Sequence, residues 1–143
     1  MLDEIKSFHF VGVGGAGMSA IAYILLKKGY RISGSDLHAS EATARLSNIG
    51  ATIFMGHAAA NLGEVGAIVL SSAIRSDNPE LVEAHRLGLP VFHRADVLAG
   101  LLNQCDGIAV AGSHGKTTTT SMIAYLLEKA GIDPNVLIGG DLD

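Results

Sequence analysis

The chain has 143 residues, of which 48% are hydrophobic and 17% charged, and a formal net charge of −4. This length predicts roughly one domain with a hydrophobic core, and the negative charge argues against a general nucleic-acid-binding protein. No apolar run reaches the roughly 18 residues of a membrane span, and the first ten residues lack the pattern of a signal peptide. A single cysteine, Cys105, excludes an internal disulfide. We therefore expect a cytoplasmic protein with neither a nucleic-acid nor a membrane partner.

Short apolar runs alternate with segments of helical period along the chain. A glycine-rich loop and a helix ending near Lys28 follow the first predicted strand, and later helices are expected at about 40–49, from residue 78, at 94–105 and at 117–130. Such alternation with short links predicts an α/β fold, a Rossmann-like doubly wound parallel sheet with right-handed crossovers. The predicted strands are residues 8–13, 31–33, 52–54, 67–70, 90–92, 107–111 and 136–138.

Two helix starts carry clear capping signals. Ser40 has the side chain of an N-cap residue, and either Asp77 or Asn78 can cap the helix that Pro79 begins. Glu80 is placed for a capping box at that second helix.

The first predicted strand leads into the pattern G-x-G-x-x-G, formed by Gly12, Gly14 and Gly17 with an additional Gly15. Glycines at these positions permit a tight turn, the approach of a pyrophosphate to the backbone, and close packing of helix on strand. Asp36 follows about 20 residues later, where an acidic side chain binds ribose hydroxyls in dinucleotide folds. The pattern therefore predicts a nucleotide site, and both a nicotinamide dinucleotide and a UDP-sugar fit it.

A second phosphate-binding loop is predicted in "VAGSHGKTTTTS", residues 110–121. The full pattern G-x-x-x-x-G-K-[ST] fails because Val110 stands at its first position, but the shorter G-x-x-G-K-T remains. Lys116 would neutralise phosphate charge, and the Thr117 hydroxyl would be a ligand of Mg²⁺. We expect the hydroxyls of the four consecutive threonines, Thr117–Thr120, to meet unpaired backbone donors or phosphate oxygens.

Other polar residues give weaker signals. Ser71 and Ser72 end the fourth predicted strand, where their hydroxyls would face a ligand crevice. His114 lies within the second loop, and the remaining histidines show no metal-ligand spacing and are interpreted as surface or core residues.

The stretches "HFVGVGGAGMSAIA", "SGSD", "SSAI", "DNPE" and "AGSHGKTTTT" together resemble the Mur ligase family. The resemblance covers nearly the whole chain and implies an N-terminal Rossmann-like domain that holds the UDP part of the substrate, followed by a central ATP-binding domain. By this resemblance the first nucleotide site would comprise Gly14, Ala16, Gly17, Met18, Ser19, Asp36, Ser71 and Ser72. The ATP site would comprise Gly112, Ser113, His114, Gly115, Lys116, Thr117 and Thr118, with Lys116 catalytic and Thr117 on Mg²⁺.

The implied reaction is an ATP-dependent ligation in peptidoglycan precursor synthesis. The resemblance implies that ATP phosphorylates the carboxylate of UDP-N-acetylmuramate and that the amine of L-alanine then displaces phosphate to form an amide. Family members are far longer, so we expect a fragment that binds the UDP-sugar without ligating. Residues 1–105 would form the substrate domain and residues 106–143 the incomplete start of the ATP-binding domain.

Two other interpretations stay open from the residues themselves. The first loop and Asp36 also suit an NAD(P)-binding dehydrogenase or regulatory domain, although the second loop is then unexplained. A binding protein that has lost the chemistry fits equally. An unpaired strand at 107–111 further predicts a homodimer that forms at high concentration.

Overall fold

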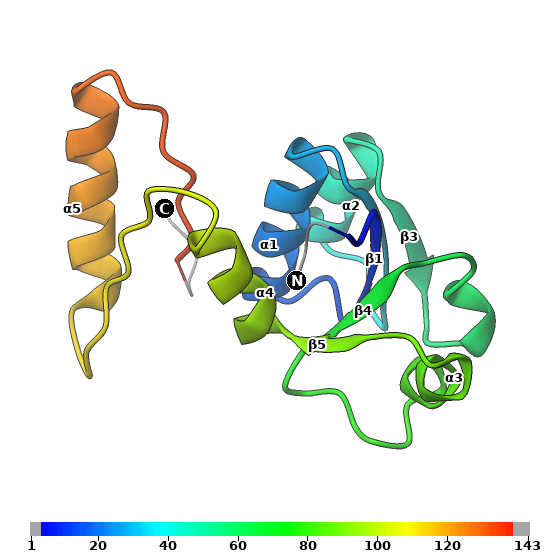
Figure 1. The fold of residues 1–143 in the computed structure, drawn as a ribbon. Coiled ribbons are helices and arrows are strands. Elements are labelled where there is room, and N and C mark those ends of the chain that lie inside the picture. Colours follow the sequence, from blue (N-terminus) through cyan, green and yellow to red (C-terminus); the bar gives the residue numbers. More distant parts are fainter. Residues whose placement is uncertain (1–3, 139–143) are drawn as a thin grey trace.

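The computed structural model describes residues 4–138 and contains a parallel sheet covered by helices (Figure 1). The strands are β1 (Ser7–Val11), β2 (Arg31–Asp36), β3 (Thr52–Met55), β4 (Ala67–Leu70) and β5 (Val91–His93). The helices are α1 (Ala16–Lys27), α2 (Glu41–Asn48), a short 3₁₀ helix η1 (Ala59–Asn61), α3 (Pro79–Leu87), α4 (Arg94–Leu102) and α5 (Lys116–Lys129).

The strand order is β3-β2-β1-β4-β5, and every neighbouring pair is parallel. The chain builds outward from β1 to β3, then crosses to the other side of β1 and continues with β4 and β5. This reversal makes the gap between β1 and β4 a topological switch point, where doubly wound sheets bind ligands at the carboxyl ends of their strands. The predicted Rossmann-like α/β fold is confirmed.

Residues alternate between the two faces of the sheet, and each face has its own core. Phe8 and Phe10 of β1 and Val69 of β4 pack with α1 and α4, whereas Val11 and Ile68 pack on the opposite face with α3. Both faces are buried, as expected for a parallel sheet with apolar strands.

The helix starts confirm Ser40 and Asn78 as N-caps, because their side chains accept hydrogen bonds from the backbone N–H groups of Thr43 and of Glu80 and Leu81, respectively. The expected capping-box role of Glu80 is wrong. Its side chain is fully buried and binds residues from several other elements. The local capping pattern around Glu80 therefore gave no sign of its long-range contacts.

Two predicted strands are absent from the described part of the chain. Residues 107–111 and 136–138 form neither strand nor helix, and Ile108 is 61% exposed. A strand needs a hydrogen-bonded neighbour, and none of the strands in residues 4–138 lies beside either segment. The dimer predicted from an unpaired strand at 107–111 thus loses its structural premise.

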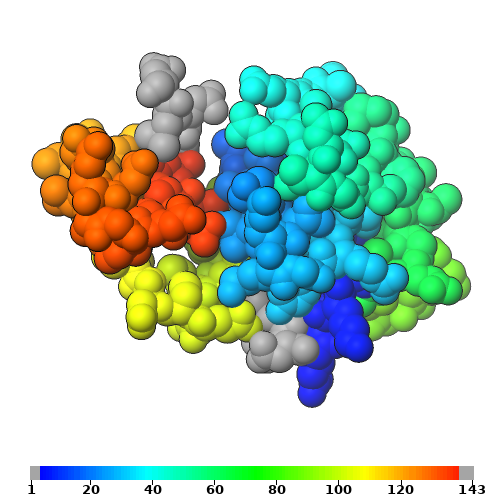
Figure 2. All heavy atoms as spheres, turned by 90° about the horizontal axis from the view of Figure 1, so that it is seen from above, coloured from blue at the N-terminus to red at the C-terminus, as the bar shows by residue number. Residues whose placement is uncertain are grey.

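Helix α5 stands apart from the sheet, and none of its residues is buried (Figures 1 and 2). Met122 and Leu126 are among its exposed apolar side chains. The segment that follows α5 returns toward α1, where residues 133–136 line a pocket with α1 and α2 and Leu137 packs against the sheet core. Within residues 4–138, no helix combines the length and apolar character needed to cross a bilayer.

Gly34 allows the loop after β1 to pack closely on β2. A Cβ at this position would lie 2.8 Å from Val13 Cβ and 3.0 Å from the Phe10 carbonyl oxygen. We expect Gly34→Ala to lower the free energy of unfolding by about 1–3 kcal/mol, since this buried contact cannot relax easily. Urea unfolding followed by circular dichroism measures this loss. Thr52→Ala, on an exposed position of the neighbouring strand, is the control, and equal stabilities of the two variants would contradict the packing argument.

Candidate nucleotide-binding site

The glycine loop lies at the switch point of the sheet. It connects the carboxyl end of β1 to the start of α1, and Gly12 adopts a φ of +80°, a left-handed conformation that favours glycine. A Cβ on Gly12 would touch Ser71 Cβ at 3.4 Å, so the loop and the end of β4 are in direct contact. The structure thus brings Ser71 next to the loop.

Some backbone N–H groups of this loop donate hydrogen bonds within the loop, and others have no acceptor among the described residues. The N–H groups of Met18 and Ser19 both donate to the Gly15 carbonyl, and the N–H of Gly15 makes a long bond of 3.4 Å to the Gly12 carbonyl. No bond is recorded among the described residues for the N–H groups of Ala16 and Gly17. These two donors begin α1 and lie at the positive end of its dipole, where anions bind.

Asp36 ends β2 and binds the loop itself. Its Oδ2 accepts a hydrogen bond of 2.8 Å from the N–H of Gly14, and its Oδ1 accepts one of 3.2 Å from the N–H of His38. A Cβ on Gly14 would lie 2.9 Å from Oδ2, so only glycine leaves room for this bond. The carboxylate therefore fixes the loop at the carboxyl end of β2.

The other predicted residues of the first site occupy different positions. Ser19 Oγ donates to the Ala16 carbonyl, Ser71 Oγ accepts from the N–H of Ala73, and Ser72 is exposed beside it. Met18 is only 2% exposed, so its side chain supports the loop from inside the core.

A buried polar cluster underlies the loop, and the sequence did not reveal it. Glu80 Oε2 accepts a bond of 2.6 Å from Ser35 Oγ and lies 2.9 Å from His57 Nδ1, while Oε1 accepts one of 2.7 Å from Asn61 Nδ2. His9 Nε2 lies 3.4 Å from Oε1, without hydrogen-bond geometry to any described atom. We call these five residues the Glu80 cluster.

The Glu80 cluster connects directly to the glycine loop through Ser35. The Ser35 carbonyl accepts hydrogen bonds from the N–H groups of Gly12 and Val13, at 2.9 and 3.0 Å, while its hydroxyl donates to Glu80. The Glu80 carboxylate on α3 therefore binds Ser35, and the carbonyl of Ser35 in turn binds the glycine loop. His9 extends the cluster, since its Nδ1 lies 2.8 Å from Ser33 Oγ.

The electrostatics of the cluster favour an ionised Glu80. Burial alone would raise the pKa of this carboxyl, but contacts with His9, Ser35 and Asn61, together with the charge of His9, outweigh burial and lower the pKa to about 2. An ionised carboxylate only accepts hydrogen bonds, so the proton of His57 lies on Nδ1, facing Oε2.

The second loop adopts an open conformation. Residues 111–119 are exposed, Gly115 has a φ of +77°, and Lys116 Nζ donates to the Gly112 carbonyl at 2.6 Å. No backbone bond is recorded in the described chain for the N–H groups of Lys116, Thr117 and Thr118, which begin α5. Thr120 Oγ1 donates to the Lys116 carbonyl, so its hydroxyl does not meet an unpaired donor as expected.

The hydrogen-bond donors of the second loop suit a polyphosphate ligand. Free N–H groups, a lysine and a threonine hydroxyl at a helix start are the groups that bind phosphate and Mg²⁺. Ser113 and His114 lie in the same exposed segment as Lys116.

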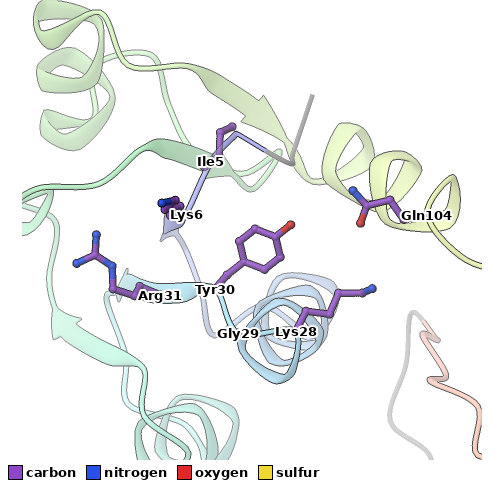
Figure 3. A pocket seen from close by; sticks show the side chains of 7 residues that line it. All are labelled: Ile5, Lys6, Lys28, Gly29, Tyr30, Arg31 and Gln104. Atoms are coloured by element: carbon purple, nitrogen blue, oxygen red, sulfur yellow. The ribbon is translucent and has the colours of Figure 1, made fainter.

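A separate pocket lies at the opposite edge of the sheet, near the amino ends of β1 and β2 (Figure 3). Lys28 and Arg31 extend in different directions there and do not converge on one point. Its lining residues are Ile5, Lys6, Lys28, Gly29, Tyr30, Arg31 and Gln104.

The pKa of Glu80 makes stability depend on pH. Because this pKa is about 2 in the fold and 4.5 without the cluster, the stabilisation is complete above about pH 5 and is lost as pH falls toward 2. His9 and His57 are the titratable groups that face the carboxylate. We expect Glu80→Gln to be less stable than the unaltered chain by roughly 3 kcal/mol at pH 7, with the gap closing toward pH 2.

Urea unfolding at a series of pH values measures this gap. Glu83→Gln, on the same helix with an ion pair to the exposed Arg86, is the matched control and should leave the stability nearly unchanged, because solvent screens an exposed ion pair. A gap for Glu80→Gln that stays constant from pH 7 to pH 2.5 would contradict the ionised cluster.

Comparison with known proteins matches this chain to one family. The model of the Mur ligase family, catalytic domain, matches residues 7–106. A UDP-N-acetylmuramate--L-alanine ligase of Syntrophotalea carbinolica is 58% identical over all 143 residues, and one of Thermosynechococcus vestitus is 56% identical over 96% of the chain. The chain spans about a third of the length of these curated relatives, 31% and 30% respectively.

Solved structures agree with this result. The UDP-N-acetylmuramate-alanine ligase of Thermotoga maritima superposes with a TM-score of 0.88 at 37% identity, covering 96% of this chain and 32% of that one. A murein peptide ligase of Psychrobacter arcticus gives a TM-score of 0.84 at 31% identity, covering 90% of this chain and 27% of that one. The fold, the sequence similarity and the two glycine-containing loops agree, and the chain belongs to the Mur ligase family.

Proposed function

We propose that the carboxyl edge of this sheet binds the UDP part of UDP-N-acetylmuramate, in a protein that joins L-alanine to that substrate with ATP. The observation that carries this proposal is the pair of open N–H groups on Ala16 and Gly17, at the switch point of the sheet. The names of relatives at 54–58% identity supply the substrate.

The remaining residues of the edge take complementary roles in this proposal. Gly14 and Asp36 hold the loop in shape, and the free lone pairs of Asp36 face the ribose of the uridine. Ser71 and Ser72 follow β4 beside the glycine loop, where their hydroxyls would contact uracil, ribose or sugar. The Ser19 hydroxyl bonds to the Ala16 carbonyl in the first turn of α1, and the buried Met18 side chain packs beneath that turn.

The second loop is proposed to hold the phosphates of ATP. The N–H groups at the start of α5 and the Lys116 ammonium would bind phosphate oxygens, and Thr117 would supply one ligand of Mg²⁺. Bound Mg²⁺ would offset the charge that develops during phosphoryl transfer. Further contacts would come from Gly112, Ser113, His114, Gly115 and Thr118.

We propose that residues 1–105 form the UDP-substrate domain and residues 106–143 belong to an ATP-binding domain, in a protein that works in the cytoplasm. The end of α4 at Leu102 and the irregular segment up to Gly115 support a boundary there.

Calorimetric titration distinguishes a UDP site from a nicotinamide site on the same fold. We expect UDP to bind the chain and NADH to show no binding at equal concentration, because the second loop and the relatives both favour the ligase. Gly14→Ala should weaken UDP binding, because its Cβ would lie 2.9 Å from Asp36 Oδ2 and the carboxylate would have to shift. Binding of NADH with no response to UDP would refute the proposal.

The chain by itself should bind without ligating. With ATP, Mg²⁺, L-alanine and UDP-N-acetylmuramate, we expect no amide and no phosphate release, because residues 111–119 are solvent-exposed and phosphoryl transfer needs a positioned, water-excluding site. Mass spectrometry of the reaction mixture and a phosphate assay measure this. Accumulation of the alanine adduct above a no-protein blank would show that the chain suffices.

A further inference from the structure

Arg94 is a cation beside the glycine loop that the sequence analysis did not single out. It is the first residue of α4, directly after β5, and its side chain lies against Gly17. A Cβ added to Gly17 would overlap Arg94 Nη1 and approach Cδ and Cζ to 3.1 Å each. The absence of a side chain at Gly17 therefore makes room for this guanidinium.

The charge of Arg94 has no partner among the described residues. Arg45, Arg75 and Arg86 each form an ion pair with a nearby carboxylate, whereas within residues 4–138 the structure gives no side-chain hydrogen bond or ion pair for Arg94 or for Arg31, and of these two only Arg94 lies beside the glycine loop. Its position at the first residue of α4 is also unfavourable for a cation, since the positive end of the helix dipole lies there. Asp96 in the same turn is engaged with the N–H of His93. An unpaired cation in this position is better explained by an anionic ligand than by stability.

The glycine loop lacks a cation of its own. Residues 12–19 contain no charged side chain, and the nearest charge on the β2 side is the negative carboxylate of Asp36, bonded to Gly14. A diphosphate bound to the N–H groups of Ala16 and Gly17 would therefore add negative charge beside a carboxylate. Arg94 contacts Gly17 from the β5 side and supplies the missing positive charge.

From this geometry we propose that Arg94 binds the diphosphate of the nucleotide, across the loop from Asp36. The proposal rests on the UDP site proposed above and adds a side-chain cation to its backbone donors. The planar guanidinium can donate two parallel hydrogen bonds to phosphate oxygens, which gives charge neutralisation and orientation together.

The test compares UDP with uridine, which lacks the phosphates. Arg94→Met keeps an unbranched apolar stem and removes the guanidinium and its charge, so we expect UDP binding to weaken by about tenfold to a hundredfold, with uridine binding unchanged. Arg94→Lys, which keeps the charge without the planar fork, should fall between the two. Calorimetry measures UDP binding, and ligand-observed NMR measures the weaker uridine binding. Arg31→Met, at the opposite edge of the sheet, is the matched control and should bind UDP normally.

The outcomes separate this role from the site itself. UDP binding by Arg94→Met within twofold of the unaltered chain would overturn the role of Arg94 and leave the UDP site standing. Equal weakening of UDP and uridine would overturn it as well, because a phosphate-binding residue cannot affect a ligand without phosphate. Failure of the unaltered chain to bind UDP would overturn both proposals. Arg94 is exposed, so Arg94→Met should unfold at the same temperature as the unaltered chain. An unchanged unfolding midpoint shows that the variant is folded and that each comparison is valid.

Discussion

Two hydrogen bonds to one carbonyl oxygen determine the shape of the candidate site. The N–H groups of Gly12 and Val13 both donate to the Ser35 carbonyl, which holds the loop against the carboxyl end of β2. The Ser35 hydroxyl in turn donates to the buried Glu80 carboxylate. The loop is therefore fixed from below by its neighbouring strand and by a charge on α3, and its outward N–H groups stay free for a ligand.

A buried carboxylate at this place has a physical cost and a physical use. Desolvation disfavours the charge, and only the donors that surround it keep the carboxyl ionised. Those donors come from β2, the loop after β3 and η1, with His9 of β1 in close contact. One side chain thus connects elements that meet at the carboxyl edge of the sheet, an arrangement that would preorganise this edge for a ligand.

The sequence predicted the parallel sheet and the position of its glycine loop because both depend on local signals. Strand–helix alternation and the spacing of Gly12, Gly14 and Gly17 are visible without a structure. The role of Glu80 was misassigned because its partner Ser35 is distant in sequence. Arg94 was missed because its neighbour Gly17 is equally distant. The strand expected at 107–111 failed for the related reason that an apolar run forms a strand only beside a neighbour.

The account depends most on the claim that the carboxyl edge of the sheet, and not the pocket at its amino edge, receives a nucleotide. Titration of the isotope-labelled chain with UDP, followed by amide chemical shifts, tests this claim directly. We predict the largest shifts at residues 14–19, at Ser71 and Ser72, and at Arg94. Shifts concentrated at Lys6 and residues 28–31, or no shifts at saturating UDP, would contradict it.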